Sequence, residues 1–464
     1  MHRPSGNGEM VDTKDLKSFD PEGLCGFKSR FPYKSQIFVL LFAIWCAAIS
    51  IAAQCRLVEV APGYSSTSVN TAVFRRSSLV SNDSLQYIAF YNPEGFLTLG
   101  RRELPHGKWT LLTTPHRGRV EDAHNIASIG LDCNGILHVA FDHHGDTLRY
   151  ARTLNSGGLE LGPLEAMTGE KGETDVTYPE FHSLPDGDLL FAFRSGASGA
   201  GNLVLNRYHA LENRWERLHD IVIDGEGERN AYWQIYVDKV GTVHLSWVWR
   251  ESWLVETNHD LCYARSRDGG STWENSSGAS LDLPITAATA EYAWRIPQGS
   301  ELINQTDMTT DSEGLPIIAT YWREKGDSVP QYRIVKRNRD KWIASQVGHC
   351  TLPFSLYGGG TKMIPISRPR VVADGNSVFV VFRDAGRGSK VSIAQSQDCE
   401  NWIISDLTDF TVDAWEPSID EEMWRRENKL HIFVEHTSQG DGETTVATDP
   451  QTIYVLETDF PHMQ

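Results

Sequence analysis

The feature that most constrains the fold is a short pattern that recurs along the chain from residue 68 onward. Each copy has a polar or aromatic residue, a short apolar strand, a turn of Asp, Asn or Gly, and a second apolar strand ending in a charged residue. The copies begin at Ser68, Ile126, Tyr178, Tyr232, Gln305, Ser367 and Glu416. Strand-only repeats of roughly 50 to 60 residues are typical of a β-propeller, because a single blade cannot bury both of its faces. We therefore predict an all-β, seven-bladed β-propeller of four-stranded antiparallel blades.

The propeller is expected to occupy residues 55–464 as a single domain, preceded by a targeting segment at residues 1–54. Within that segment, basic residues precede an apolar run at residues 37–53 that ends in small side chains, as in a signal peptide. Cleavage near Ala53 would make the protein secreted or periplasmic, with no stable membrane association afterwards. The alternative is a signal anchor, in which residues 37–53 keep the protein at the membrane.

The charge balance limits the class of partner. The formal net charge is −18, and nucleic-acid binders instead need Lys and Arg to neutralise phosphates, so we expect no nucleic-acid partner. An anionic ligand would have to be bound by basic groups gathered in one place. The cysteines outside the targeting segment are scattered and do not indicate a disulfide framework. A monomer is the default expectation.

A cluster of histidines is predicted at one end of a hairpin. The apolar runs Ile126–Leu131 and Ile136–Phe141 are joined by Asp-Cys-Asn-Gly, which favours a hairpin turn. His124 precedes the first strand, and His143 and His144 follow the second, so they lie at the same edge. Imidazole is well suited to proton transfer near neutral pH, which makes His124 and His144 candidate site residues. The alternative is that these histidines are structural, and the role of His143 stays open.

Other repeated features indicate packing. His138, His244 and His431 occupy the same mid-strand position in three repeats, and we predict that they are structural. Residues 266–273 have the form S-x-D-x-G-x-T-W of an Asp box, and residues 396–402 are a degraded copy. Asp boxes occur in propellers of many functions, so they indicate the fold and not the activity.

In a propeller, the residue before the first strand and the residue after the second strand of each blade share one face. This places aromatic and basic residues on the same rim as His124 and His144. They are Tyr178, Arg194, Tyr232, Arg250, Arg323, Arg383 and His436. A phenol there can stack on a sugar or donate a proton, and guanidinium groups bind carboxylate or sulfate in a bidentate manner. The alternative is that the tyrosines pack against neighbouring blades and that most of the arginines are structural.

Two His/Cys pairs suggest a metal site. His259 with Cys262 and His349 with Cys350 would give a four-coordinate N2S2 site, suited to zinc, if neighbouring blades bring the pairs together. No ligand position would stay open, so such a zinc would be structural. The alternative is that the pairs belong to unrelated polar loops.

The motifs DAHN, DHHG, TYPEF, FAFRSG and NAYWQIY, with the Asp box, resemble those of the BNR-repeat proteins that include the seven-bladed ulvan lyases. The resemblance covers nearly all of the chain after residue 60. It implies an exported polysaccharide lyase acting on a sulfated polyanion in which uronic acid adjoins sulfated rhamnose. By matching motif, the active-site residues would be His124, His144, Tyr178 and Arg194. It also implies a second tyrosine, for which we choose Tyr232 while Tyr236 stays open, and a structural zinc.

The chemistry expected from these residues is β-elimination with no cofactor. Removal of the weakly acidic C5 proton of a uronate requires its carboxylate to be neutralised, for which we choose Arg194. His124 and Tyr178 would be the acid/base pair, in either order, with His144 assisting and Tyr232, Arg250 and His143 binding substrate. The alternatives are a sialidase-like glycoside hydrolase and a non-catalytic carbohydrate-binding propeller.

Overall fold

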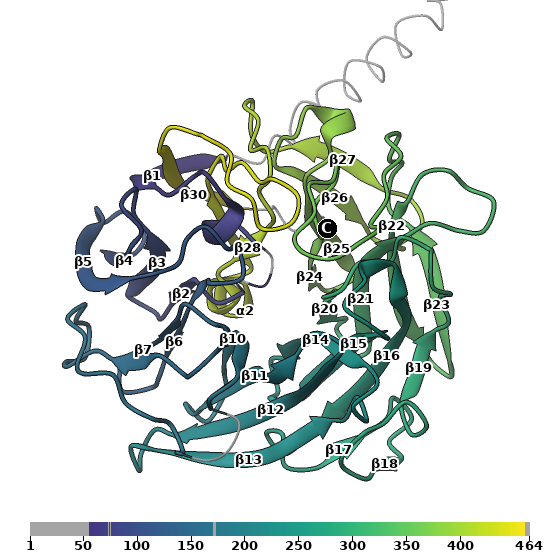
Figure 1. Cartoon of the computed structure of the whole chain (residues 1–464), viewed down its shortest axis with the longest axis horizontal. Coiled ribbons are helices and arrows are strands. Elements are labelled where there is room, and N and C mark those ends of the chain that lie inside the picture. The colour runs from purple at the N-terminus through teal and green to yellow at the C-terminus, as the bar shows by residue number, and fades with distance from the viewer. Residues whose placement is uncertain (1–54, 73, 75, 170–172, 460–464) are drawn as a thin grey trace, which may run out of the picture. The chain divides into compact units, whose positions relative to one another are not determined.

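The computed structural model describes residues 55–459, except residues 73, 75 and 170–172. Its strands form seven antiparallel sheets around a central axis, with one edge strand of each sheet towards the centre of the ring (Figure 1). The predicted all-β, seven-bladed β-propeller is confirmed. Among the described residues, no helix is long and apolar enough to cross a membrane. The targeting segment predicted at residues 1–54 lies outside the described residues.

Four blades contain the expected four strands. The first blade is β2 (Leu79–Ser81), β3 (Leu85–Tyr91), β4 (Phe96–Glu103) and β5 (Thr110–Arg117). The fifth is β20 (Asp307–Thr310), β21 (Pro316–Trp322), β22 (Gln331–Asn338) and β23 (Lys341–Gln346), and the sixth is β24 (Arg370–Asp374), β25 (Ser377–Phe382), β26 (Ser392–Ser396) and β27 (Ile403–Asp406). The seventh is β28 (Ser418–Ile419), β29 (Lys429–Val434), β30 (Gln451–Asp459) and β1 (Arg56–Gly63), with the helix α2 (Glu421–Glu427) between β28 and β29.

The seventh blade joins the two ends of the described chain. Its outermost strand, β1, pairs antiparallel with β30, from Arg56 opposite Glu457 to Gly63 opposite Gln451. Apolar side chains of the first and seventh blades, including Ile88 and Ile453, share one core cluster. Closing the ring therefore buries apolar faces that would otherwise be open to water.

The other three blades depart from the four-strand expectation. The second has only β6 (Ala127–Leu131), β7 (Leu137–Phe141) and β9 (Tyr150–Arg152). The third has β10 (Val176–Ser183), β11 (Leu189–Ala197), β12 (Ala200–His209) and β13 (Arg214–Ile223), and it gains β8 (His144–Asp146) as an extra inner strand. The fourth has β14 (Asn230–Val237), β15 (Val243–Arg250), β16 (Asn258–Ser266), β17 (Trp273–Glu274) and β18 (Ser280–Leu281), with β19 (Glu291–Trp294) paired to β16. Because β8 pairs with β10, the segment that carries His144 is fixed to the next blade.

The predicted hairpin of β6 and β7 is confirmed. The Asp132 carboxylate stabilises its turn by accepting hydrogen bonds from the backbone N–H groups of Asn134 and Ile136, each at 2.9 Å. As a consequence of this pairing, His124 and His144 lie at the same end of the hairpin, and their ring centroids are 4.1 Å apart.

The three histidines predicted to be structural are all buried. The Nδ1 atom of His138 lies 2.6 Å from the Tyr150 hydroxyl, and that of His244 lies 2.8 Å from the Tyr263 hydroxyl. In both blades the tyrosine belongs to the neighbouring strand. His431 is only 6% exposed. These rings are packed in the interior and also contact neighbouring blades, since His138 lies against Tyr208 of the third blade and His431 Nδ1 is 2.9 Å from Gln86 Nε2 of the first.

The turn in residues 266–273 holds a tryptophan in the fourth blade. The Asp268 carboxylate accepts hydrogen bonds from the Ser266 hydroxyl at 2.7 Å and from the Thr272 N–H at 2.8 Å. Trp273 is 2% exposed, and its indole N–H donates to the Gly270 carbonyl at 3.1 Å. The turn thus fixes an indole ring in the apolar core of the blade.

We predict that Trp273→Ala lowers the free energy of unfolding by about 3–5 kcal/mol, because it leaves a large cavity in a packed core. Urea unfolding followed by fluorescence and circular dichroism measures this loss. Trp402→Ala is the matched control, since Trp402 occupies the equivalent position in residues 396–402 but is only partly buried. Equal losses in the two variants would contradict the interpretation.

Candidate active site

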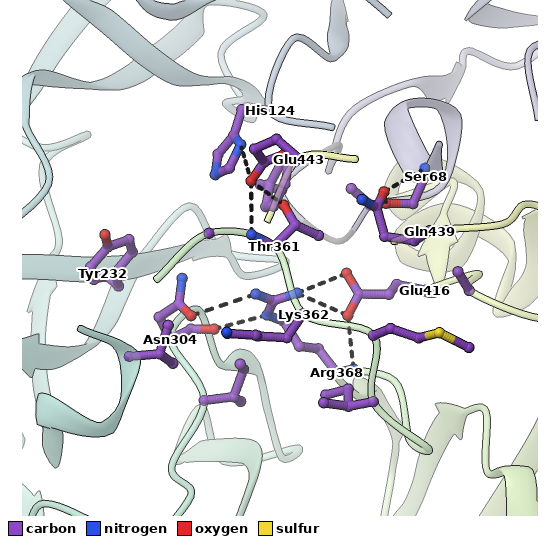
Figure 2. A pocket seen from close by; sticks show the side chains of 18 of the residues that line it. Ser68, His124, Tyr232, Asn304, Thr361, Lys362, Arg368, Glu416, Gln439 and Glu443 are labelled. Atoms are coloured by element: carbon purple, nitrogen blue, oxygen red, sulfur yellow. Dashed lines mark hydrogen bonds and ion pairs between the residues drawn. The ribbon is translucent and has the colours of Figure 1, made fainter. Parts of the chain in front are cut away.

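A cavity of about 540 Å³ lies where the starts of the first strands and the ends of the second strands meet. This volume is in the range of small-molecule binding sites. Most of the residues predicted to share a rim line it. They are His124, His144, Tyr178, Arg194, Tyr232, Arg250 and Arg383. Figure 2 shows His124 and Tyr232 in this cavity with side chains from the fifth to seventh blades.

Three other candidates do not line the cavity. His143 is fully buried, and its Nε2 atom accepts a hydrogen bond from the Arg149 N–H at 2.7 Å. Burial lowers the pKa of His143 to about 3, so the ring is neutral. The prediction that His143 binds substrate is therefore wrong. Arg323 instead donates to the Gly299 carbonyl at 2.8 Å, and His436 is not among the cavity residues.

One carboxylate organises the two candidate histidines. Asp122 Oδ1 lies 2.7 Å from His124 Nδ1, and Asp122 Oδ2 lies 2.6 Å from His144 Nδ1. The imidazole rings stack with an interplanar angle of 16°, and Phe74 stacks on the other side of His124 at 5.0 Å. Within the described part of the chain, the Nε2 atom of His124 has no hydrogen-bond partner. This nitrogen is therefore available to a ligand in the cavity.

The surroundings of His124 favour its charged form. Burial alone would lower its pKa, but hydrogen bonds and negative charge from Asp122 and Glu443 raise it to about 9. Glu443 Oε1 is 3.5 Å from His124 Nδ1. Burial would raise the pKa of Asp122, yet hydrogen bonds from His124 and His144 hold it well below its usual range. His124 is thus an imidazolium at neutral pH, placed between two carboxylates.

Asp122, His124 and His144 are also possible metal ligands, since their donor atoms lie within 4.8 Å of one another. The lone pairs of an imidazole lie in the plane of its ring. In two stacked rings they run side by side and do not converge on one ion, as tetrahedral coordination requires. The arrangement suits two hydrogen bonds to one carboxylate better than a shared metal.

Tyr178 is held in an unusual backbone conformation. Its φ angle is 57°, a left-handed value that non-glycine residues seldom adopt, and it lies where the pairing of β10 with β11 is interrupted. The Arg194 guanidinium is 4.9 Å from the centre of its ring. The Tyr178 hydroxyl makes no hydrogen bond to any described residue. Such strain often occurs at functional positions, where the surrounding fold holds the residue in place.

Tyr232 lies next to Tyr178, with ring centroids 6.0 Å apart. Its hydroxyl is 3.0 Å from the Ser198 hydroxyl and accepts a hydrogen bond from Arg250 at 3.3 Å. Burial would raise the pKa of Tyr232, but the charges of Arg250 and Arg194 lower it. Burial, with a further contribution from Tyr232, raises the pKa of Tyr178. The two phenols therefore titrate as an interacting pair beside two guanidinium groups.

The cavity contains positive charge that the described residues do not neutralise. Four of its cations form no ion pair with a described carboxylate: Arg194, Arg250, Lys362 and Arg383. Arg194 is 3% exposed, its Nη2 donates to the Thr177 hydroxyl at 3.1 Å, and its Nε is buried without a partner. Arg368 differs, because both Glu416 oxygens lie 2.9 Å from its Nη1 (Figure 2). Such a cavity is suited to an anionic ligand.

The model of the BNR repeat-containing family matches residues 85–350, which is more than half of the chain. This protein belongs to that family. The ulvan lyase (long isoform) of Alteromonas sp is 23% identical over 356 residues, covering 62% of this chain and 34% of the relative. The corresponding enzyme of Pseudoalteromonas sp. (strain PLSV) is 23% identical over 351 residues, with the same coverage. The chain thus spans about a third of the length of these relatives.

Solved structures of the same fold include polysaccharide lyase Uly1, with a TM-score of 0.65 and 15% identity, covering 87% of this chain and 99% of that one. A PL25 ulvan lyase bound to -[GlcA(1-4)Rha3S]- has a TM-score of 0.56 and 15% identity, covering 87% of this chain and 96% of that one. At this identity, the likeness establishes the shared propeller.

The zinc site predicted in this BNR-repeat protein does not form from the chosen residues. His259 Nε2 lies 2.7 Å from Glu251, and Cys262 is fully buried in the core of the fourth blade. Cys350 packs in a separate core between the fifth and sixth blades. Among the described residues, only Asp122, His124 and His144 gather as three possible ligands. The prediction of a zinc site from the His259, Cys262, His349 and Cys350 set is wrong, because the pairs belong to different cores.

Sequence reasoning missed several residues of the site. Asp122 lies two positions before His124 in the DAHN motif, so its role could have been inferred from the spacing of Asp and His. Glu416 opens the seventh copy of the repeat, as Tyr178 and Tyr232 open theirs, so its place at the rim could have been inferred as well. Glu443 and Lys362 carry no comparable signal. They lie in irregular loops before or after strands of the sixth and seventh blades, and only the closed ring brings them to the hairpin.

We predict that His124 titrates near pH 9, whereas His143 stays neutral down to about pH 3. Ring-nitrogen NMR shifts of protein labelled with ¹⁵N-histidine report both events. His124→Gln and His143→Gln assign the two signals by their disappearance. A His124 signal already neutral at pH 7 would contradict the charge assigned to this ring.

Proposed function

We propose that this protein is an exported polysaccharide lyase that cleaves a sulfated, uronic-acid-containing polysaccharide, of the ulvan type, by β-elimination. The observation that carries the proposal is the combination in one cavity of a charged histidine, two buried phenols and four cations without carboxylate partners. A uronate polymer supplies negative charge for these cations. It also supplies a C5 proton whose removal breaks the C4–O bond.

In the proposed reaction, Arg194 binds the carboxylate of the reacting uronate. Neutralising this carboxylate makes the C5 proton more acidic, because the carbanion-like charge that develops can spread onto it. Arg194 is suited to the role since its side chain is buried, has an unpartnered Nε and forms no ion pair with a described carboxylate. A buried guanidinium attracts a carboxylate more strongly than an exposed one does.

His124 is the proposed proton donor. It is charged at neutral pH, and its Nε2 has no partner among the described residues. As the C4–O bond breaks, this nitrogen protonates the departing oxygen. Asp122 and His144 fix the ring so that the donor stays in one orientation. For these reasons we propose His124 as the acid of the acid/base pair.

Tyr178 is the proposed base. Its hydroxyl is free of protein hydrogen bonds within the described residues. Burial and Tyr232 raise the pKa of Tyr178, and the charges of Arg194 and Arg250 oppose that rise. Because Tyr178 and Tyr232 interact, ionisation is a property of the pair and not of either phenol alone. The basic form of this pair accepts the proton. The phenolate takes the C5 proton, the C–H electrons form the C4–C5 double bond, and His124 and Tyr178 then exchange protons with solvent. Tyr232 and Arg250 also bind the substrate.

The relatives support the substrate class. Two similar proteins are ulvan lyases, and a structure of the same fold was solved with glucuronate linked to sulfated rhamnose. The proposal of export rests on the signal-like sequence before residue 55, and no cofactor is needed for the proposed elimination. The protein is proposed to act as a monomer without stable membrane association.

The runner-up is a sialidase-like glycoside hydrolase. A tyrosine nucleophile would need a carboxylate bonded to its hydroxyl, and neither Tyr178 nor Tyr232 has one among the described residues. Glu416 is occupied by Arg368. A non-catalytic binding propeller is a further alternative, but it gives no role to a charged histidine beside a strained tyrosine.

We expect the purified protein to release products with ultraviolet absorbance from a C4–C5 double bond when incubated with ulvan or related uronate polymers. New reducing ends without this absorbance would favour the hydrolase. Binding without cleavage would favour the carbohydrate-binding propeller. If no uronate polymer gives an unsaturated product, the proposal fails.

We predict that His124→Ala lowers turnover by about 10²- to 10⁴-fold, the usual contribution of a general acid. Arg194→Ala is expected to lower it by about 10²-fold or more, because the transition-state charge loses its partner. The melting temperature of both variants should stay near that of the wild type. Arg323→Ala is the matched control, since Arg323 directly follows the equivalent strand β21 but does not line the cavity, and this variant should retain full activity.

A further inference from the structure

Two long loops meet beside the cavity. One precedes β24 and contains residues 356–364, and the other joins β29 to β30 and contains residues 440–446. The Gly442 N–H donates to the Thr361 carbonyl at 2.9 Å, and the Met363 N–H donates to Asp441 Oδ1 at 2.7 Å. These contacts join the sixth blade to the seventh. We call residues 356–364 and 440–446, joined by these contacts, the clasp.

The first of these loops is anchored at its other side as well. The Val255 N–H donates to the Gly358 carbonyl at 2.8 Å, and the Gly358 N–H donates to Glu256 Oε2 at 2.8 Å. A Cβ on Gly359 would lie only 2.5 Å from the Trp253 ring, so the indole packs directly against the backbone. The loop is therefore held between the fourth and seventh blades.

Glu443 lies at the centre of the clasp and faces His124. Its Oε1 atom accepts hydrogen bonds from the Thr361 N–H at 2.7 Å and from the Thr361 hydroxyl at 2.6 Å (Figure 2). The same oxygen is 3.5 Å from His124 Nδ1. The φ angle of Glu443 is 58°, and its Oε2 atom is buried without a hydrogen-bond partner among the described residues. Both features cost free energy that local packing alone does not recover.

We infer that Glu443 is a positioning residue: held by Thr361, it keeps the His124 imidazole charged and oriented, so that formation of the clasp assembles the proton donor. The role of His124 as a proton donor rests on the proposed lyase function. The effect of Glu443 on the charge and orientation of His124 does not depend on that function. Thr361 fixes one Glu443 oxygen with two donors, so the carboxylate cannot turn away from the ring. Asp122 alone has to serve two histidines, and Glu443 gives His124 a second negative partner.

The groups that face His124 come from several elements. Asp122 and His144 belong to the hairpin end, Glu443 to the clasp, and Tyr178 to β10, with its ring centroid 5.8 Å from that of His124. Phe74 closes one side of the ring and carries no charge. Of these groups, the two carboxylates favour the imidazolium, and burial opposes it. Removing one carboxylate must therefore shift the balance towards the neutral ring.

The test is Glu443→Gln, which keeps the shape and an acceptor for Thr361 but removes the charge. The NMR titration midpoint of His124 should fall by about one pH unit or more, the usual effect of losing a charge at this distance. In parallel, the ratio of kcat/KM in the variant to that in the wild type should fall several-fold between about pH 7 and about pH 9. The ionisation of the tyrosine pair affects both proteins and cancels in this ratio.

Asp441→Asn is the matched control. It removes one charge from the same loop and keeps an acceptor for Met363, but its carboxylate makes no contact with His124. The His124 midpoint should therefore stay at its wild-type value. Thr361→Val retains the Glu443 charge and removes one of its two donors, so a smaller shift in the same direction is expected.

An unchanged His124 midpoint in Glu443→Gln would overturn the inference, whatever the activity. A comparable fall in Asp441→Asn would also overturn it, because the effect would then be one of overall charge. If the midpoint falls only in Glu443→Gln and Thr361→Val, the positioning role is supported. This holds even if no uronate polymer is cleaved, in which case only the lyase proposal fails.

Discussion

The pairing of β1 with β30 joins strands from opposite ends of the described chain, and the site of this protein depends on it. Each blade has apolar residues on both faces, which become buried only when neighbouring blades pack on either side. Once the ring closes, the ends of the inner strands have no freedom to separate. Phe74 from the first blade then stacks on the His124 ring, and Glu443 from the seventh blade lies near its Nδ1 atom. Burial of apolar surface therefore sets the geometry of a polar cavity.

Several features of the cavity lower the stability of the fold, and packing of the closed ring compensates for their cost. Tyr178 and Glu443 have left-handed backbone angles, and buried polar atoms of Arg194 and Glu443 have no hydrogen-bond partner in the part of the chain that the structure describes. Each such feature costs on the order of 1–3 kcal/mol, which is a large part of the net stability of a domain. All of them face the same cavity. Unpartnered buried atoms also occur elsewhere, at His138 for example, but here they meet left-handed backbone angles in the cavity that His124 and Arg194 line.

The fold could be predicted because its signal is repeated. Seven copies of the same strand pair give the class, the number of blades and the positions of the inner strands, and the turn at Asp132 gives the hairpin. The exceptions are local. The strand β8 follows the second blade in sequence but pairs with β10 of the third blade, and the sequence of residues 144–146 gives no sign of this pairing. Its pairing depends on the neighbouring β10, whose free inner edge exists only in the folded ring.

The site was predictable where a residue follows from its place in the repeat, as for His124, Tyr178, Arg194 and Tyr232. It was not predictable where packing in the folded chain decides whether a side chain faces the cavity or the core. His143 is adjacent to His144 in sequence, yet consecutive residues of an extended chain point in opposite directions, and His143 faces the core. The His/Cys pairs fail for a similar reason, because strand packing directs Cys262 and Cys350 into separate cores. Glu443 and Lys362 lie in loops with no repeat to place them.

The charge of the molecule adds a constraint on how it meets a ligand. With a net charge of −18, the surface as a whole repels a polyanion, whereas the cavity holds four cations that form no ion pair with a described carboxylate. Repulsion between exposed charges is screened within about 10 Å at moderate ionic strength, and buried charges are screened much less. Attraction therefore acts mainly once the ligand has entered the cavity, where Arg194 and Arg250 lie close to the tyrosine rings. Under the proposed function, a polyanion held in this way would be bound at the reacting sugar rather than along its length, which would concentrate binding near His124 and Tyr178.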